Sequence, residues 1–320
     1  MIRRHPEVPD YFLVLEPQRS FGEYARVYGD RLARHYEDNG VIVVPSIPIP
    51  LDLEYFQQLA FPLELQKAIG TVNGIERSIF VRDGDRFAVH QNHPLVQLLG
   101  DVARATYAQR QIVTFNARLR HGLSVLFPRY LSLEEANITW RLSETIEEGM
   151  HFDVFAQGAP LPESQRSLHR LKIFINIDAT ERRWRTSLPL PGVLERCRSA
   201  LPDELPDDIN VVCDVIDRFR LLGALPCHDL AYPTLSAVIA NGETVAHEVV
   251  YGRRVVAAEF FCRSADMLDP DKLSHACLAR WLREAGYTVG RDARAISERY
   301  AHLQRSAELV RAARAGMAGA

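Results

Sequence analysis

The segment that most constrains the fold is His169–Asp178, in which two kinds of side chain alternate. The alternating sets are Leu171, Ile173, Ile175 and Ile177 on one side and Lys172, Phe174 and Asn176 on the other. Successive side chains of an extended strand point to opposite faces, so a period of two places each set on its own face. This segment is therefore predicted to be a β-strand with two distinct faces.

Strand-like runs dominate residues 138–261, and helical patterns dominate the segments on either side. Within the strand-rich region, a Pro-rich insertion at 188–225 has helical potential, and residues 235–240 end at the turn signal Asn241-Gly242. The other predicted elements are a helix from Phe21, a strand at Val41–Val44, a helix from Asp52 to about Ile69, a hairpin tip at Arg82–Arg86, and helices at Pro94–Leu126, Asp271–Ala285 and Arg291–Arg314.

These patterns predict an α+β protein with a mainly β core. We expect residues 1–130 to form a mixed helix and strand platform, residues 131–269 the core with its helical insertion, and residues 270–320 the C-terminal helices, all in one compact domain. A chain of 320 residues with 47% apolar side chains can bury a large core.

Charge and cysteine content narrow the function classes. The net charge of −3 argues against a dedicated nucleic-acid binder, although residues 166–185 hold six basic against two acidic side chains, which suits an anionic ligand. Five widely spaced cysteines without a Cys-x-x-Cys pair indicate reduced thiols. With no signal peptide or apolar spanning segment evident, we expect a cytoplasmic protein whose membrane contact, if any, is peripheral on the cytoplasmic face of the inner membrane.

A candidate metal site begins with His151-Phe152-Asp153, at the end of a strand-like run in which Ile138 and Trp140 alternate with polar residues. In an extended strand His151 and Asp153 share a face, and a third candidate, His247, lies 94 residues beyond Asp153. Two histidines and one carboxylate with open positions are the ligand set of non-haem Fe(II) oxygenases, although Mn or Co suits the same ligands. The alternative is chance, since a three-residue pattern arises easily in a chain with 11 histidines.

Antiparallel strands that carry an early His-x-Asp and a late His predict a double-stranded β-helix, the jelly-roll barrel of the cupins. At this point the chain resembles the Fe(II)/2-oxoglutarate-dependent dioxygenases. The resemblance implies Fe(II), the cosubstrate 2-oxoglutarate and O₂, with a basic residue after the distal His binding the far carboxylate. In Gly252-Arg253-Arg254 that residue is predicted to be Arg254, with Arg253 on the other face of the strand, Lys172 in reserve and Asn176 as a hydrogen-bonding partner.

The wording of residues 140–145, 151–155, 169–178 and 182–185 resembles the Kdo hydroxylase family more closely. That resemblance implies hydroxylation of carbon 3 of a 3-deoxy-D-manno-oct-2-ulosonic acid (Kdo) residue in the lipopolysaccharide inner core, on Kdo-lipid A, with release of succinate and CO₂. Its anionic groups are expected to contact Arg141, Arg166, Arg170, Arg182, Arg183 and Arg185, with Trp140 and Trp184 stacking on a sugar unless they pack in the core.

Two other functions stay open at the level of sequence. One is a 2-oxoglutarate dioxygenase of another substrate, and the other is a cupin-like metal-dependent sugar isomerase or binding protein. A homo-oligomer and a membrane contact through the basic last helix, 291–314, also stay open.

Overall fold

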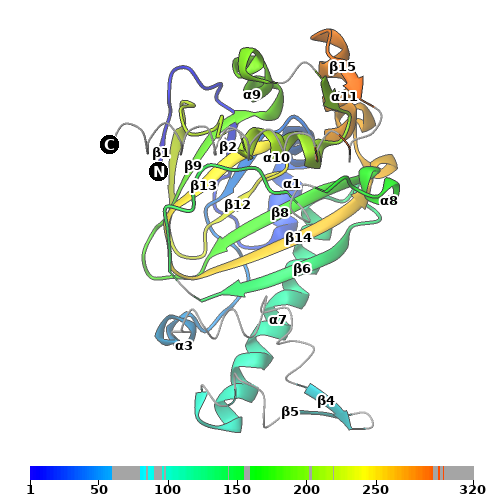
Figure 1. Ribbon diagram of the computed structural model, residues 1–320. Helices are drawn as coiled ribbons and strands as arrows, with labels where there is room; N and C mark the ends of the chain where they lie inside the picture. The colour runs from blue at the N-terminus through cyan, green and yellow to red at the C-terminus, as the bar shows by residue number, and fades with distance from the viewer. Residues whose placement is uncertain are drawn as a thin grey trace.

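The computed structural model of the chain describes residues 1–59, 80–83, 86–89, 99–142, 144–154, 159–201, 204–218 and 220–290, with residues 96, 295 and 298. Their strands form two large sheets that face each other (Figure 1). In spatial order, the six-stranded sheet consists of β2 (Phe12–Val14), β3 (Val41–Val44), β12 (Ala237–Ile239), β8 (Leu168–Asn176), β14 (Val255–Arg263) and β6 (Glu134–Arg141). The five-stranded sheet consists of β1 (Ile2–Arg3), β11 (His228–Tyr232), β9 (Arg182–Pro189), β13 (Val245–Gly252) and β7 (Thr145–Ile146).

From β6 onward the chain passes back and forth between the two sheets, which is the path of a jelly roll. Strands β6, β8, β12 and β14 lie in the six-stranded sheet, whereas β7, β9, β11 and β13 lie in the five-stranded sheet. Among the described residues no strand belongs to both sheets. The predicted barrel is therefore an open two-sheet sandwich in this part of the chain, because side-chain packing and not a continuous hydrogen-bond ladder joins its halves.

Alternation along β8 separates two hydrophobic cores, as the sequence predicted. Leu171, Ile173 and Ile175 belong to a first core that lies between the six-stranded sheet and a layer of helices. The helices of that layer are α1 (Phe21–Tyr28), α2 (Arg31–Glu37), α3 (Leu53–Gln58) and α7 (Val102–Leu126). Phe174, on the opposite face of β8, belongs to a second core that fills the space between the sheets together with Trp184 of β9.

The insertion between β9 and β11 is helical, as predicted, and covers the second core. It contains α9 (Leu190–Arg196), a 3₁₀ turn (Arg198–Ala200) and α10 (Ile209–Arg218). Helix α11 (Ser274–Glu284), within the predicted helix Asp271–Ala285, packs against α9 and α10, and β10 (Glu204–Pro206) pairs in parallel with β15 (Thr288–Gly290). The remaining short elements are α8 (Glu163–Arg166) and the 3₁₀ turns Ser264–Asp266 and Pro270–Lys272.

The N-terminal helices show where local signals succeed. Asp52 caps α3 by accepting a hydrogen bond from the Tyr55 N–H, as predicted, while the continuation to Ile69 lies outside the described residues. The pattern from Phe21 forms two helices, since Gly29 has a φ of 49° and ends α1. The helix expected at Pro94–Leu126 is α7, which starts at Val102.

Two further predictions concern the ends of the described chain. The hairpin around Arg82–Arg86 is confirmed as the pair β4 (Phe80–Asp83) and β5 (Arg86–Val89). The predicted helix Arg291–Arg314 falls on residues that lie almost wholly outside the described part. Among the helices of the described residues, none combines the length and the hydrophobicity needed to cross a bilayer.

Candidate metal centre

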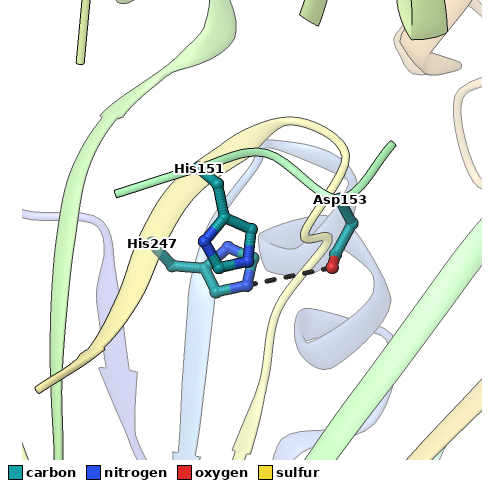
Figure 2. A group of neighbouring side chains, drawn as sticks. All are labelled: His151, Asp153 and His247. Carbon is teal, nitrogen blue, oxygen red and sulfur yellow. Dashed lines mark ion pairs between the residues drawn. The ribbon is translucent and has the colours of Figure 1, made fainter. Parts of the chain in front are cut away.

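His151, Asp153 and His247 meet between the two sheets, as Figure 2 shows. One ligand atom from each residue lies within 4.8 Å of the others, and Nε2 of His247 is 3.8 Å from Oδ2 of Asp153. In the described part of the chain, this is the one cluster of three such side chains placed to share an ion. The structure thus brings together the three residues that the sequence analysis selected.

Backbone hydrogen bonds hold the two histidines side by side. The His151 N–H donates to the His247 carbonyl at 3.0 Å, and the His247 N–H donates back to the His151 carbonyl at 2.9 Å. Residues that exchange both hydrogen bonds in an antiparallel pair lie directly opposite each other with side chains on one face. The imidazole centroids are accordingly 4.7 Å apart.

Asp153 is held by the turn between β12 and β13. Its N–H donates to the Gly242 carbonyl at 2.8 Å. A Cβ on residue 242 would lie 1.8 Å from Oδ2 of Asp153 and 3.0 Å from Cε1 of His247. The turn signal Asn241-Gly242 was visible in the sequence, but the need for glycine against the carboxylate was not.

Both imidazoles present Nε2 to the centre. Nδ1 of His151 lies 2.7 Å from the Gly149 carbonyl, and Nδ1 of His247 lies 2.9 Å from the Val245 carbonyl. A carbonyl only accepts, so each Nδ1 carries the proton and each Nε2 keeps a lone pair. Burial also lowers the pKa of His247 to about 4, which keeps this ring neutral at pH 7.

The charges around Asp153 favour its ionised form. Burial alone would raise its pKa, but the Lys172 ammonium, followed by His247 and Arg170, holds the pKa of this carboxyl below its ordinary value. Lys172 Nζ is 2.7 Å from Oδ2, and Arg170 donates to the Asp153 backbone carbonyl at 3.1 Å while pairing with Glu259. Oδ2 is buried and accepts no well-formed hydrogen bond.

Two imidazole lone pairs and one carboxylate oxygen form a donor set that fits a divalent iron, manganese or cobalt ion. The buried Oδ2, which lacks a hydrogen bond, is the kind of atom that a metal ion would satisfy. One side of the site is a dry aromatic wall, since the Trp184 ring stacks on His247 at 5.2 Å and Phe174 lies 4.7 Å from Trp184.

The residues predicted to bind 2-oxoglutarate occupy different surroundings. Arg254 forms a buried ion pair with Asp178 and donates to the Leu59 carbonyl, whereas Arg253 is exposed in the β13–β14 turn. Lys172 lies against Asp153, as described above. The Asn176 side chain donates to the carbonyls of Thr180 and Tyr232. Of these four residues, Lys172 alone contacts the metal cluster, and the assignment of Arg254 stays a prediction.

The residues predicted to bind substrate also separate. Trp140 is buried in the first core, where its Nε1 donates to Asn116, so it packs as the core alternative proposed. Arg141 is exposed at the end of β6, and Arg166 pairs with Asp207 on the surface. Arg183 and Arg185 are exposed on β9, Arg185 pairing with Asp229 and Glu248. Arg170 and Arg182 are buried.

Comparisons with known proteins rest on structure. No protein-family profile and no curated protein sequence matches the chain. Three solved structures of the Kdo hydroxylase KdoO, described as a non-haem Fe(II) alpha-ketoglutarate-dependent dioxygenase, match over most of both chains. The complex with alpha-ketoglutarate (2-oxoglutarate) and Fe(III) has 19% identity over 87% of this chain and 97% of the other, with a TM-score of 0.54.

The complex of KdoO with succinate and Fe(III) has 19% identity over 88% of this chain and 98% of the other, with a TM-score of 0.55. The cobalt(II) complex has 17% identity over the same shares, with a TM-score of 0.54. The fold that the sequence resemblance implied is thereby confirmed. The chain has the fold of a Kdo hydroxylase and, between its two sheets, a His-Asp-His cluster suited to a divalent metal ion.

Proposed function

We propose that the protein is an Fe(II)- and 2-oxoglutarate-dependent dioxygenase that hydroxylates carbon 3 of a Kdo sugar in the lipopolysaccharide inner core. The observation that carries the proposal is the His151-Asp153-His247 cluster, which lies inside a jelly roll with the fold of KdoO. Fold likeness alone supports many chemistries, whereas a facial triad with open positions favours this one.

In the proposed reaction, 2-oxoglutarate and O₂ are consumed, the substrate C–H becomes C–OH, and succinate and CO₂ are released. Iron bound at the triad supplies the activation of O₂ that couples these changes. The residues of the chain hold the ligands in one geometry: the Gly149 and Val245 carbonyls fix the imidazoles, and Lys172 lies against the Asp153 carboxylate. The wall formed by Trp184 and Phe174 keeps water from that side of the centre.

An anionic sugar is the substrate class that the surroundings favour. Arg141 is exposed at the end of β6, beside the strand β14 that crosses the same sheet. Its charge also acts on the buried guanidinium of Arg182, so positive charge gathers at this end of the sandwich. A Kdo residue carries a carboxylate that such a surface would attract.

The experiment that tests this function is mass spectrometry of a Kdo-lipid A precursor after incubation with the protein, Fe(II), 2-oxoglutarate and air. We expect a gain of one oxygen on the Kdo residue that depends on 2-oxoglutarate. His151→Ala should abolish it, whereas His121→Ala, which alters an exposed histidine of α7, should retain it.

Each other outcome has a definite meaning. Slow succinate formation without an oxidised sugar would retain the dioxygenase and reject Kdo as its substrate. Neither succinate nor oxidised sugar from folded, iron-loaded protein would reject the proposal and favour a cupin-like isomerase or binding protein.

A further inference from the structure

Arg182 is a buried cation without an ionic partner in the described part of the chain. It begins β9 with 3% of its surface exposed, and no carboxylate of the described residues lies within ion-pair distance of it. Its Nε is buried and has no hydrogen-bond partner. Taking a guanidinium out of water costs several kcal/mol unless an anion compensates, so this side chain is prepared for a ligand.

Two more buried donors without partners lie beside Arg182. They are Nε1 of Trp184, on the same face of β9, and the hydroxyl of Tyr232, which is opposite Arg182 in the β9–β11 register. The rings of Trp184 and Tyr232 are 6.2 Å apart and nearly perpendicular. Buried polar atoms in proteins almost always have partners, so three such donors on neighbouring strands indicate a polar ligand.

The backbone and the local charge also suit an anion. A Cβ on Gly252 would lie 2.1 Å from Nη1 of Arg182, so glycine at this point of β13 leaves room for the guanidinium. Arg141 adds a second positive charge, and the one acidic residue that acts on Arg182, Glu148, is exposed and beyond ion-pair distance.

The position of Arg182 relates it to the metal cluster. Trp184 stacks on His247, and Arg182 lies two residues further along β9, which is about 7 Å on a strand. A short molecule with a carboxylate at Arg182 would therefore place its other end near the triad.

We propose that Arg182, with Tyr232 and Trp184, forms a buried carboxylate-binding pocket next to the metal centre. The inference rests on the proposed function and deepens it, because it assigns the pocket to Arg182 and not to Arg254. The two arginines differ in one decisive respect: the carboxylate of Asp178 already neutralises Arg254. The carboxylate that fits comes from one of two sources, the distal end of 2-oxoglutarate or the acid group of the sugar.

The test is calorimetric titration of the cobalt(II)-loaded protein, without O₂, with 2-oxoglutarate, with pyruvate and with Kdo. Pyruvate is a 2-oxo acid that lacks the distal carboxylate. If Arg182 holds that carboxylate, Arg182→Met weakens 2-oxoglutarate binding about 10- to 100-fold and leaves pyruvate binding unchanged. If it holds the sugar, the same variant weakens Kdo binding and spares 2-oxoglutarate.

Two further variants guard against misfolding and nonspecific loss. Tyr232→Phe keeps the ring and removes the hydroxyl, so a smaller loss for the same ligand is expected. Arg185→Met, an exposed arginine on the same strand, should bind all three ligands as the unaltered protein does.

The proposal is overturned if Arg182→Met and Tyr232→Phe bind every ligand normally, or if Arg254→Met alone abolishes 2-oxoglutarate binding. Cobalt(II) binding, titrated first, shows separately whether the metal site exists. A protein that binds cobalt and the diacid but never forms succinate would refute the proposed function and retain this pocket.

Discussion

Replacing Gly242 by alanine should break the metal centre while leaving the fold in place. The new Cβ would lie 1.8 Å from Oδ2 of Asp153, whereas touching heavy atoms are separated by about 3.5 Å. The carboxylate oxygen must therefore move by about 1.7 Å. Metal sites hold their ligand distances to about 0.2 Å, so this oxygen can no longer share an ion with His151 and His247.

The expected loss exceeds that of a supporting residue. Loss of an outer partner of a metal ligand typically weakens metal binding about 10- to 100-fold, and displacement of the ligand itself should weaken it more. The backbone at Gly242 is not left-handed, so alanine is conformationally acceptable there and the sheets should still form.

Calorimetry with cobalt(II) in the absence of O₂ measures the effect without relying on activity. Gly223→Ala is the matched control, because a Cβ there meets nothing within 4 Å and the backbone is again not left-handed. If Gly242→Ala bound cobalt(II) as tightly as Gly223→Ala, the placement of Asp153 in the site would be refuted.

Three other substitutions test the physical account. Burial lowers the pKa of His169 to about 4, below its unfolded value near 6.5, so the unfolded chain binds more protons between these pH values; the free energy of unfolding should fall by about 3 kcal/mol from pH 6.5 to 4, and urea titrations of His169→Phe should show a flatter profile. Gly149→Ala forces a non-glycine residue into a φ of 89°, which costs about 1–3 kcal/mol and shifts the carbonyl that fixes His151; weaker cobalt(II) binding is predicted, and unchanged stability and affinity would contradict it. Arg254→Met leaves Asp178 buried and unpaired, so urea unfolding should show a loss of about 3–5 kcal/mol, which Asp178→Leu should largely restore in the double variant; a single variant as stable as the parent would contradict the structural role.

Features with a local period could be predicted from the sequence. The alternation along His169–Asp178 gave both faces of β8, because side-chain direction in a strand depends only on position parity. The spacing His-x-Asp placed two metal ligands on one face for the same reason. The third ligand, His247, followed from the known ligand set and the strand order that brings β13 beside His151.

Features that depend on contacts between distant segments could not be predicted. Arg254 and Asp178 are separated by 76 residues, and no local pattern indicates that one neutralises the other. The stacking of Trp184 on His247 and the approach of Gly242 to Asp153 likewise exist only after the strands pair. Strands β1 and β2 were missed because runs of two and three residues are too short to show a period, and only their pairing with β11 and β3 defines them.

The central claim is that His151, Asp153 and His247 hold an iron ion that 2-oxoglutarate joins. The most direct measurement is the visible absorption spectrum of the Fe(II)-loaded protein under anaerobic conditions before and after 2-oxoglutarate is added. The account predicts that a metal-to-ligand charge-transfer band appears, and that Asp153→Ala loses it while His121→Ala keeps it. Folded, iron-loaded protein that shows no such band with 2-oxoglutarate would contradict the claim.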